Sequence, residues 1–159
     1  MKQPPDLQKA QDNMRPRVIT LDGFLGTDTR NLIDILIEDD ADVKRLNLDH
    51  RTIAARMSEL RTAGMNGLGD FITIPPHFEV RVDVVRGRLP CPFGHKGLVR
   101  KTNITVRNLR LNREITYTEL NIHMIGAHGF YEGRGATFRL DPAILAEILE
   151  VSSETPSEP

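Results

Sequence analysis

Apolar and polar residues alternate most regularly in the middle of the chain. Apolar side chains occupy every second position from Phe78 to Val84, and charged side chains fill the positions between them. This period of two is typical of a half-buried β-strand. The stretch 98–108 is predicted to be its antiparallel partner, with residues 89–97 as the connection and 115–117 as a short returning strand.

A helical period marks the first part of the chain. Apolar residues recur there at intervals of three and four, which indicates amphipathic helices. The first helix is expected to begin at Thr27 or Asp28, and a short second helix is expected over 40–47. The third is predicted to start at Asp49 as N-cap and to stop at Gly64.

Two more helices are predicted from their capping residues. Thr118 can cap a helix that runs to residue 128 and ends at Gly129. Asp141 followed by Pro142 is typical of the start of another helix. Short strands are further expected at 17–21 and 137–140.

These elements predict one α+β domain over residues 17–150. Its N-terminal helices are expected to pack on a mainly antiparallel sheet, with a Cys-His hairpin knuckle followed by a His-bearing helix. Residues 1–16 and the tail 151–159 are expected to be disordered, since neither has periodic apolar positions.

Composition narrows the class of protein. The chain has 159 residues, 39% hydrophobic and 27% charged, and no apolar run approaches the roughly 20 residues that span a membrane. A net charge of -1 argues against a strongly basic nucleic-acid binder. The start of the chain lacks the apolar core of a secretory signal, and one cysteine cannot form an internal disulfide. A cytoplasmic location is therefore expected.

The candidate chemistry lies in four residues that form two pairs. Cys91 and His95 share a turn in the stretch "LPCPFGHKG", whose prolines and glycine bend the backbone as in a zinc knuckle. His123 and His128 have an H-x4-H spacing that zinc fingers tolerate. Thiolate and imidazole suit zinc, so the four residues are a candidate zinc site.

The spacing also raises a difficulty. Residues five apart on a helix point about 140° away from each other, so His123 and His128 are expected to share an ion only if the last turn unwinds. His77 is a substitute ligand if one of them points elsewhere. Without a metal, Cys91 is a packed turn residue and His123 an ordinary helix histidine.

Four protein ligands would make a structural site, because a filled tetrahedron leaves no place for an activated water. The function expected first is thus a zinc-stabilised binding or regulatory module. A metal-dependent hydrolase would need an open position, with Glu119 or Glu132 as general base. A cysteine-dependent enzyme would need Cys91 paired with His95 or His123, with Glu132 to orient the histidine.

A nucleic-acid-binding regulator is a further alternative. One candidate is the third predicted helix, which carries Arg51, Arg56 and Arg61 and is followed by a ribbon, as in winged-helix regulators. The other is the hairpin, which could form a basic tip. Its cations are Arg86, Arg88, Lys96, Arg100 and Lys101. A homodimer that covers the apolar surface of a short sheet is also left open.

The blocks "LPCPFGH", "IHMIGAHGFYEGRG" and "FRLDP" together resemble a family of uncharacterised bacterial cytosolic proteins. The resemblance covers most of residues 17–150 and includes all four candidate ligands. It implies a discrete folded unit. It implies no activity, substrate or partner.

Overall fold

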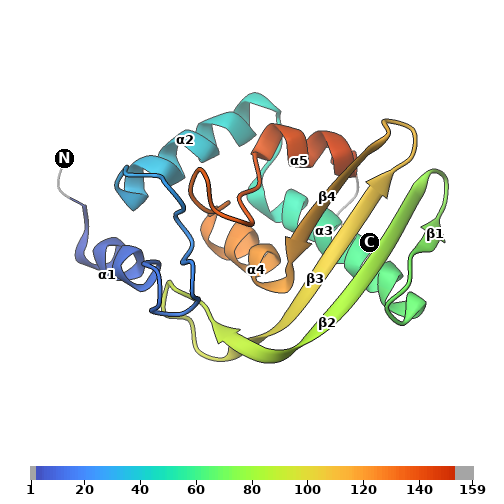
Figure 1. Cartoon of the computed structure of the whole chain (residues 1–159). Coiled ribbons are helices and arrows are strands. Elements are labelled where there is room, and N and C mark those ends of the chain that lie inside the picture. Colours follow the sequence, from blue (N-terminus) through green and yellow to red (C-terminus); the bar gives the residue numbers. More distant parts are fainter. Residues whose placement is uncertain (1–2, 153–159) are drawn as a thin grey trace.

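The computed structural model describes residues 3–152, and it confirms the α+β class (Figure 1). The helices are α1 (Pro5–Asn13), α2 (Leu32–Arg45), α3 (His50–Gly64), α4 (Glu119–His128) and α5 (Pro142–Leu149), with a short 3-10 turn at Met65–Gly67. The strands are β1 (Ile72–Ile74), β2 (Phe78–Pro90), β3 (Leu98–Asn108) and β4 (Arg113–Thr118). Within this part of the chain, no helix combines the length and apolar character needed to cross a membrane.

The four strands form one antiparallel sheet in the order β1-β2-β3-β4. The predicted pairing of β2 with β3 is confirmed, with Val82 opposite Ile104. This hairpin is longer than expected, because the two strands pair again beyond an irregularity between Val84 and Arg88. A bulge of this kind bends and twists a ribbon. Neither β1 nor β4 pairs with residues 84–102, so this part of the hairpin projects past the rest of the sheet, and we call it the arm.

Three predicted helix starts are confirmed by side-chain caps. The Asp49 carboxylate accepts from the Thr52 N–H at the start of α3. Thr118 and Asn121 form a reciprocal capping box on α4, which satisfies backbone N–H groups that the helix cannot. The Asp141 carboxylate accepts from the Ala143 and Ile144 N–H groups at the start of α5. Gly129 ends α4 in the left-handed conformation, with φ of 66°.

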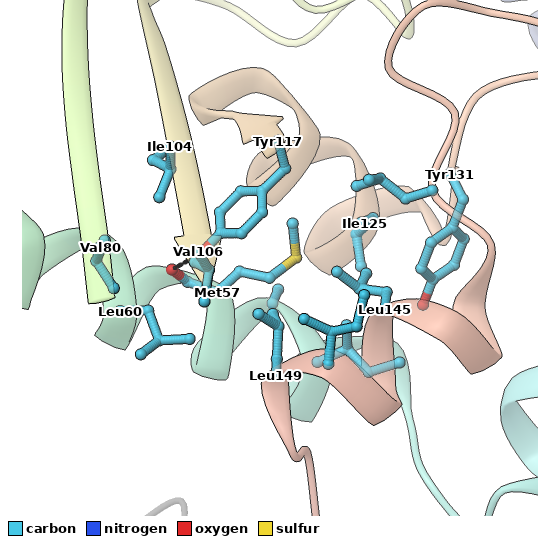
Figure 2. Packing of buried hydrophobic residues seen from close by; sticks show 14 of the residues in the cluster. Met57, Leu60, Val80, Ile104, Val106, Tyr117, Ile125, Tyr131, Leu145 and Leu149 are labelled. Atoms are coloured by element: carbon cyan, nitrogen blue, oxygen red, sulfur yellow. Dashed lines mark hydrogen bonds between the residues drawn. The ribbon is translucent and has the colours of Figure 1, made fainter. Parts of the chain in front are cut away.

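The main core lies between the sheet and helices α3, α4 and α5, which cover one of its faces (Figures 1 and 2). Met57, Ile104 and Tyr117 are all fully buried there. The Tyr117 hydroxyl donates to the Met57 carbonyl at 2.8 Å, so its one buried polar group is satisfied. A second cluster joins α1, α2 and α4, and it includes Cys91 at the end of the arm.

Several sequence predictions are wrong. The segment 1–16 is not disordered where it is described, because α1 spans Pro5–Asn13 and buries Ala10. The predicted helix at 40–47 is the second half of α2, which runs continuously from Leu32 to Arg45. Residues 17–21 and 137–140 form turns and loops rather than strands.

The start of α2 differs from the prediction for a long-range reason. Neither Thr27 nor Asp28 caps it. The Gln11 side chain of α1 accepts from the Leu32 N–H at 2.8 Å. Asp28 binds the Arg30 guanidinium instead. The short strand β1 is absent from the sequence prediction, and the tail from residue 153 onward lies outside the described residues.

Candidate metal centre

The first two candidate ligands lie in the turn at the tip of the arm. Cys91 follows the last residue of β2, and His95 comes four residues later. The turn is closed by a hydrogen bond from the Gly94 N–H to the Cys91 carbonyl at 3.0 Å. Gly94 has φ of 89°, a conformation that side chains rarely adopt. The turn thus brings the thiol and the imidazole to the same end of the arm.

The other two ligands come from α4. His123 lies within the helix and His128 is its last residue. The expected unwinding is wrong, since α4 is helical through His128. The two ring centroids are nevertheless 5.5 Å apart, because both imidazoles turn toward the arm tip that packs against the helix.

All four candidate ligands converge. One ligand atom from each of Cys91, His95, His123 and His128 lies within 4.8 Å of the others. The Cys91 Sγ is 3.6 Å from the His128 Nε2, and the His95 Nδ1 is 3.2 Å from the His123 Nε2. Residues separated by up to 37 positions are therefore assembled into one group that could hold a metal ion.

Burial shifts the pKa values of Cys91, His123 and His128. It lowers the pKa of His128 to about 4 and lowers that of His123, and nearby histidines add to both effects. Burial also raises the pKa of the Cys91 thiol, which is only 5% exposed. Neutral imidazoles at pH 7 present lone pairs to a cation, whereas the thiol must lose its proton to bind one.

Aromatic and polar contacts hold the arm tip in place. Phe93 stacks on His128, with ring centroids 4.1 Å apart and planes 11° from parallel, and it meets Phe130 edge to face. The Asn13 side chain of α1 donates to the Pro92 carbonyl at 3.0 Å. Sequence reasoning missed both contacts. For the stacking of Phe93 on His128, the sequence offered one indication, which is the aromatic residue between Cys91 and His95.

The remaining histidines lie elsewhere. His77 is hydrogen-bonded to Glu150 at 2.7 Å, so its suggested role as a substitute ligand is wrong. His50 lies between the Tyr131 hydroxyl and the Asp40 carboxylate, at 2.9 Å from each. Neither belongs to the group that could hold a metal.

The two glutamates named as candidate bases have other partners. Glu119 faces the Arg61 guanidinium at 3.5 Å. Glu132 is 4% exposed and accepts a hydrogen bond from the Asn121 side chain at 2.8 Å. Burial raises the pKa of Glu132 from 4.5 to about 7, although the Asn121 donor opposes the rise. Asn121 was not singled out in the sequence, since its spacing to Glu132 follows no motif.

The arm carries a concentration of free cations. Its five basic residues are exposed, and their side chains form no ion pair or hydrogen bond with any other described residue. They are Arg86, Arg88, Lys96, Arg100 and Lys101. No acidic residue occurs between Asp83 and Glu114. By contrast, Arg56 and Arg61 on α3 are both engaged in ion pairs.

Comparison of the chain with protein-family models, curated proteins and solved structures finds no match. The resemblance of the sequence blocks to bacterial cytosolic proteins thus stays an expectation. The geometry of the described residues is the basis for assigning a function.

Proposed function

We propose that Cys91, His95, His123 and His128 bind one Zn²⁺ ion that stabilises the protein as a binding module. The observation that carries the proposal is the convergence of the four ligand atoms. Zinc bonds of about 2.3 Å to sulfur and about 2.0 to 2.1 Å to nitrogen, arranged as a tetrahedron, separate two nitrogens by about 3.4 Å and sulfur from nitrogen by about 3.6 Å. Here one nitrogen pair is 3.2 Å apart, one sulfur–nitrogen pair is 3.6 Å apart, and all four ligand atoms lie within 4.8 Å of one another.

The donor set supports a structural role for the ion. Four protein ligands complete a tetrahedron, so no position is left for a reactive water. Bound there, zinc would tie the arm tip to α4 and fix the direction of the whole arm. A single cysteine used as a metal ligand also fits a reducing compartment, and we therefore place the protein in the cytoplasm.

Elemental analysis of untagged protein tests the proposal, with Cys91→Ser and His123→Ala as site variants. We expect about one zinc per chain in the native protein, and loss of zinc with a lower unfolding temperature in both variants. His77→Ala is the matched control, because His77 lies outside the site. It should keep its zinc. Native protein without zinc, or zinc retained in both site variants, would overturn the assignment.

The effect of removing His95 distinguishes a structural zinc site from the site of a metal-dependent hydrolase. It lies in the exposed turn at the arm tip, and its loss would open the tetrahedron. A structural site predicts that His95→Ala weakens zinc binding together with stability. Full zinc affinity and unchanged stability in His95→Ala would mean a three-ligand site with a bound water, as the hydrolase alternative requires. The buried thiol of Cys91, with its raised pKa, does not favour the cysteine-dependent enzyme.

Nucleic-acid binding by the arm is the second candidate function, and the five unpaired cations favour it. Exposed cations without acidic neighbours are typical of surfaces that contact phosphates. Fluorescence anisotropy with a labelled DNA duplex at several salt concentrations tests it. Each phosphate that a variant no longer neutralises should make the slope of log K against log salt shallower by about 0.9. Arg86→Gln with Arg88→Gln should do so, whereas Arg17→Gln, outside the arm, should not.

A further inference from the structure

A cavity of about 240 Å³ lies beside the arm, apart from the four candidate metal ligands. Four stretches of chain line it: the loop 20–24, the arm, the start of α4, and the loop between α4 and α5. Most of the lining is apolar, including Phe24, Leu89, Val99 and Leu120. The volume lies just below the range of about 300 to 1,000 Å³ that is typical of pockets for drug-sized ligands, so the cavity suits a smaller molecule.

The cavity contains one buried acid. Glu132 lines it and is 4% exposed, so its carboxyl group is almost wholly withdrawn from bulk solvent. Asn121 donates to its Oε2, and no other described residue forms a hydrogen bond with the carboxyl group. Its backbone is also held at φ of 69°, which is unfavourable for a residue other than glycine. The second oxygen, Oε1, is not fully buried, so a hydrogen-bond donor that enters the cavity can reach it.

Two cations and a second acid also line the cavity. Arg100 and Lys101 of β3 and Asp22 of the loop 20–24 are exposed, so they form part of its rim. Neither cationic side chain has a partner among residues 3–152. The cavity thus combines an apolar body with a buried acid inside and, at the edge, two unpaired cations and one exposed acid. A ligand that carries a hydrogen-bond donor and an acidic group on an apolar skeleton would complement the buried acid and the cations.

The walls are fixed by backbone hydrogen bonds. The Gly133 N–H, next to Glu132, donates to the Phe24 carbonyl at 2.9 Å. The Thr27 N–H donates to the Arg134 carbonyl at 3.0 Å. A Cβ atom at Gly133 would lie 2.3 Å from the Leu25 carbonyl oxygen, so only glycine allows the two loops to approach this closely. The cavity is therefore preformed, as small-molecule sites usually are.

We propose that this cavity binds a small apolar α-amino acid. Its ammonium group would donate to Glu132, its carboxylate would face Arg100 and Lys101, and its side chain would fill the apolar part. The charged pair with Glu132 provides selectivity, because a ligand without the donor leaves the buried carboxyl unpaired. This binding site is separate from the metal centre, and its assignment does not depend on which ion the centre holds.

Amide chemical shifts measured by NMR on the full chain, prepared as purified, test the proposal with three probes of matched shape. L-leucine carries both polar groups, 4-methylpentanoate lacks the amine, and 3-methylbutylamine lacks the carboxylate. We expect saturable shifts with L-leucine at amides of residues 20–24, 99–103 and 137–138. Each truncated probe should bind about tenfold more weakly, the size expected for one lost hydrogen bond to a charged group.

Two variants connect the binding to the named residue. Glu132→Gln should lower the affinity for L-leucine by about tenfold and leave the affinity for 4-methylpentanoate unchanged. Glu147→Gln is the matched control, since Glu147 pairs with Arg113 and is not in the lining. It should bind L-leucine as the native chain does. Absence of saturable shifts, equal affinity for all three probes, or an unchanged affinity in Glu132→Gln would each overturn the proposal.

Discussion

Glu132→Gln should change how the stability of the protein depends on pH. The buried carboxyl has a pKa of about 7 in the folded protein, against an ordinary value of 4.5. The folded state therefore holds its proton more tightly than the unfolded chain does. Stability from this group is fully present below pH 4.5 and is lost as the pH rises through about 7. Glutamine is neutral at every pH and can still accept from Asn121, so the variant should lack this loss.

The magnitude follows from the same pKa. Each pKa unit corresponds to about 1.4 kcal/mol, so ionisation of Glu132 should lower the unfolding free energy by about 3 kcal/mol between about pH 4 and pH 8. The native chain and Glu132→Gln should be equally stable at low pH. At about pH 8 the variant should be more stable by about 3 kcal/mol.

Urea unfolding at a series of pH values measures this difference. Histidine protonation and metal release affect both proteins alike, so they cancel when the variant is compared with the native chain at each pH. Glu147→Gln is the control, because Glu147 is 58% exposed and its change should add no such slope. Parallel stability curves for the native chain and Glu132→Gln would refute the reasoning.

Three further outcomes are expected. Tyr117→Phe should lower the unfolding free energy by about 1 kcal/mol in urea titrations, since the hydrogen bond to the buried Met57 carbonyl is lost; an unchanged value would contradict this. Asp39→Asn should lower the unfolding free energy by about 3 kcal/mol, because Asp39 is 2% exposed and binds the Arg139 guanidinium through both oxygens. A variant that unfolds at the same temperature as the native chain would contradict this. Chelation of zinc should expose the arm tip to trypsin at Lys96, and mass spectrometry showing equal cleavage with and without chelator would count against a zinc link between the arm tip and α4.

Local sequence signals predicted the elements that depend on local interactions. The caps Asp49, Thr118 and Asp141 act on N–H groups two or three residues away, so their spacing alone identifies them. The alternation from Phe78 to Val84 identifies β2 for the same reason.

Elements stabilised by distant residues were not predictable in this way. Helix α1 has a polar sequence, and its Gln11 side chain is used as the cap of α2, 21 residues later. No periodicity within either segment reveals that interaction. Prediction placed the start of α2 at Thr27 or Asp28 because a sequence pattern identifies only capping residues that are close along the chain.

The candidate metal centre could be predicted from short sequence motifs, whereas the cavity could not. Cysteine and histidine are the usual ligands of zinc, and their spacing can be recognised in a sequence. Two such pairs were therefore enough to name four candidate ligands: Cys91, His95, His123 and His128. The cavity has no such signature. Its lining comes from four stretches of common residues, and Glu132 became informative only when its burial and its single partner were known.

The 37-residue separation between Cys91 and His128 has a consequence for the unfolded chain. An ion that stays bound to both residues in the unfolded chain acts as a cross-link, and closing a loop of this length removes conformational entropy from the unfolded ensemble. For a covalent cross-link of that length the stabilisation is about 4 kcal/mol. A disulfide provides it only under oxidising conditions, whereas a metal cross-link forms in a reducing compartment and can be withdrawn by a competing chelator. The lifetime of the folded chain would then follow the availability of free zinc.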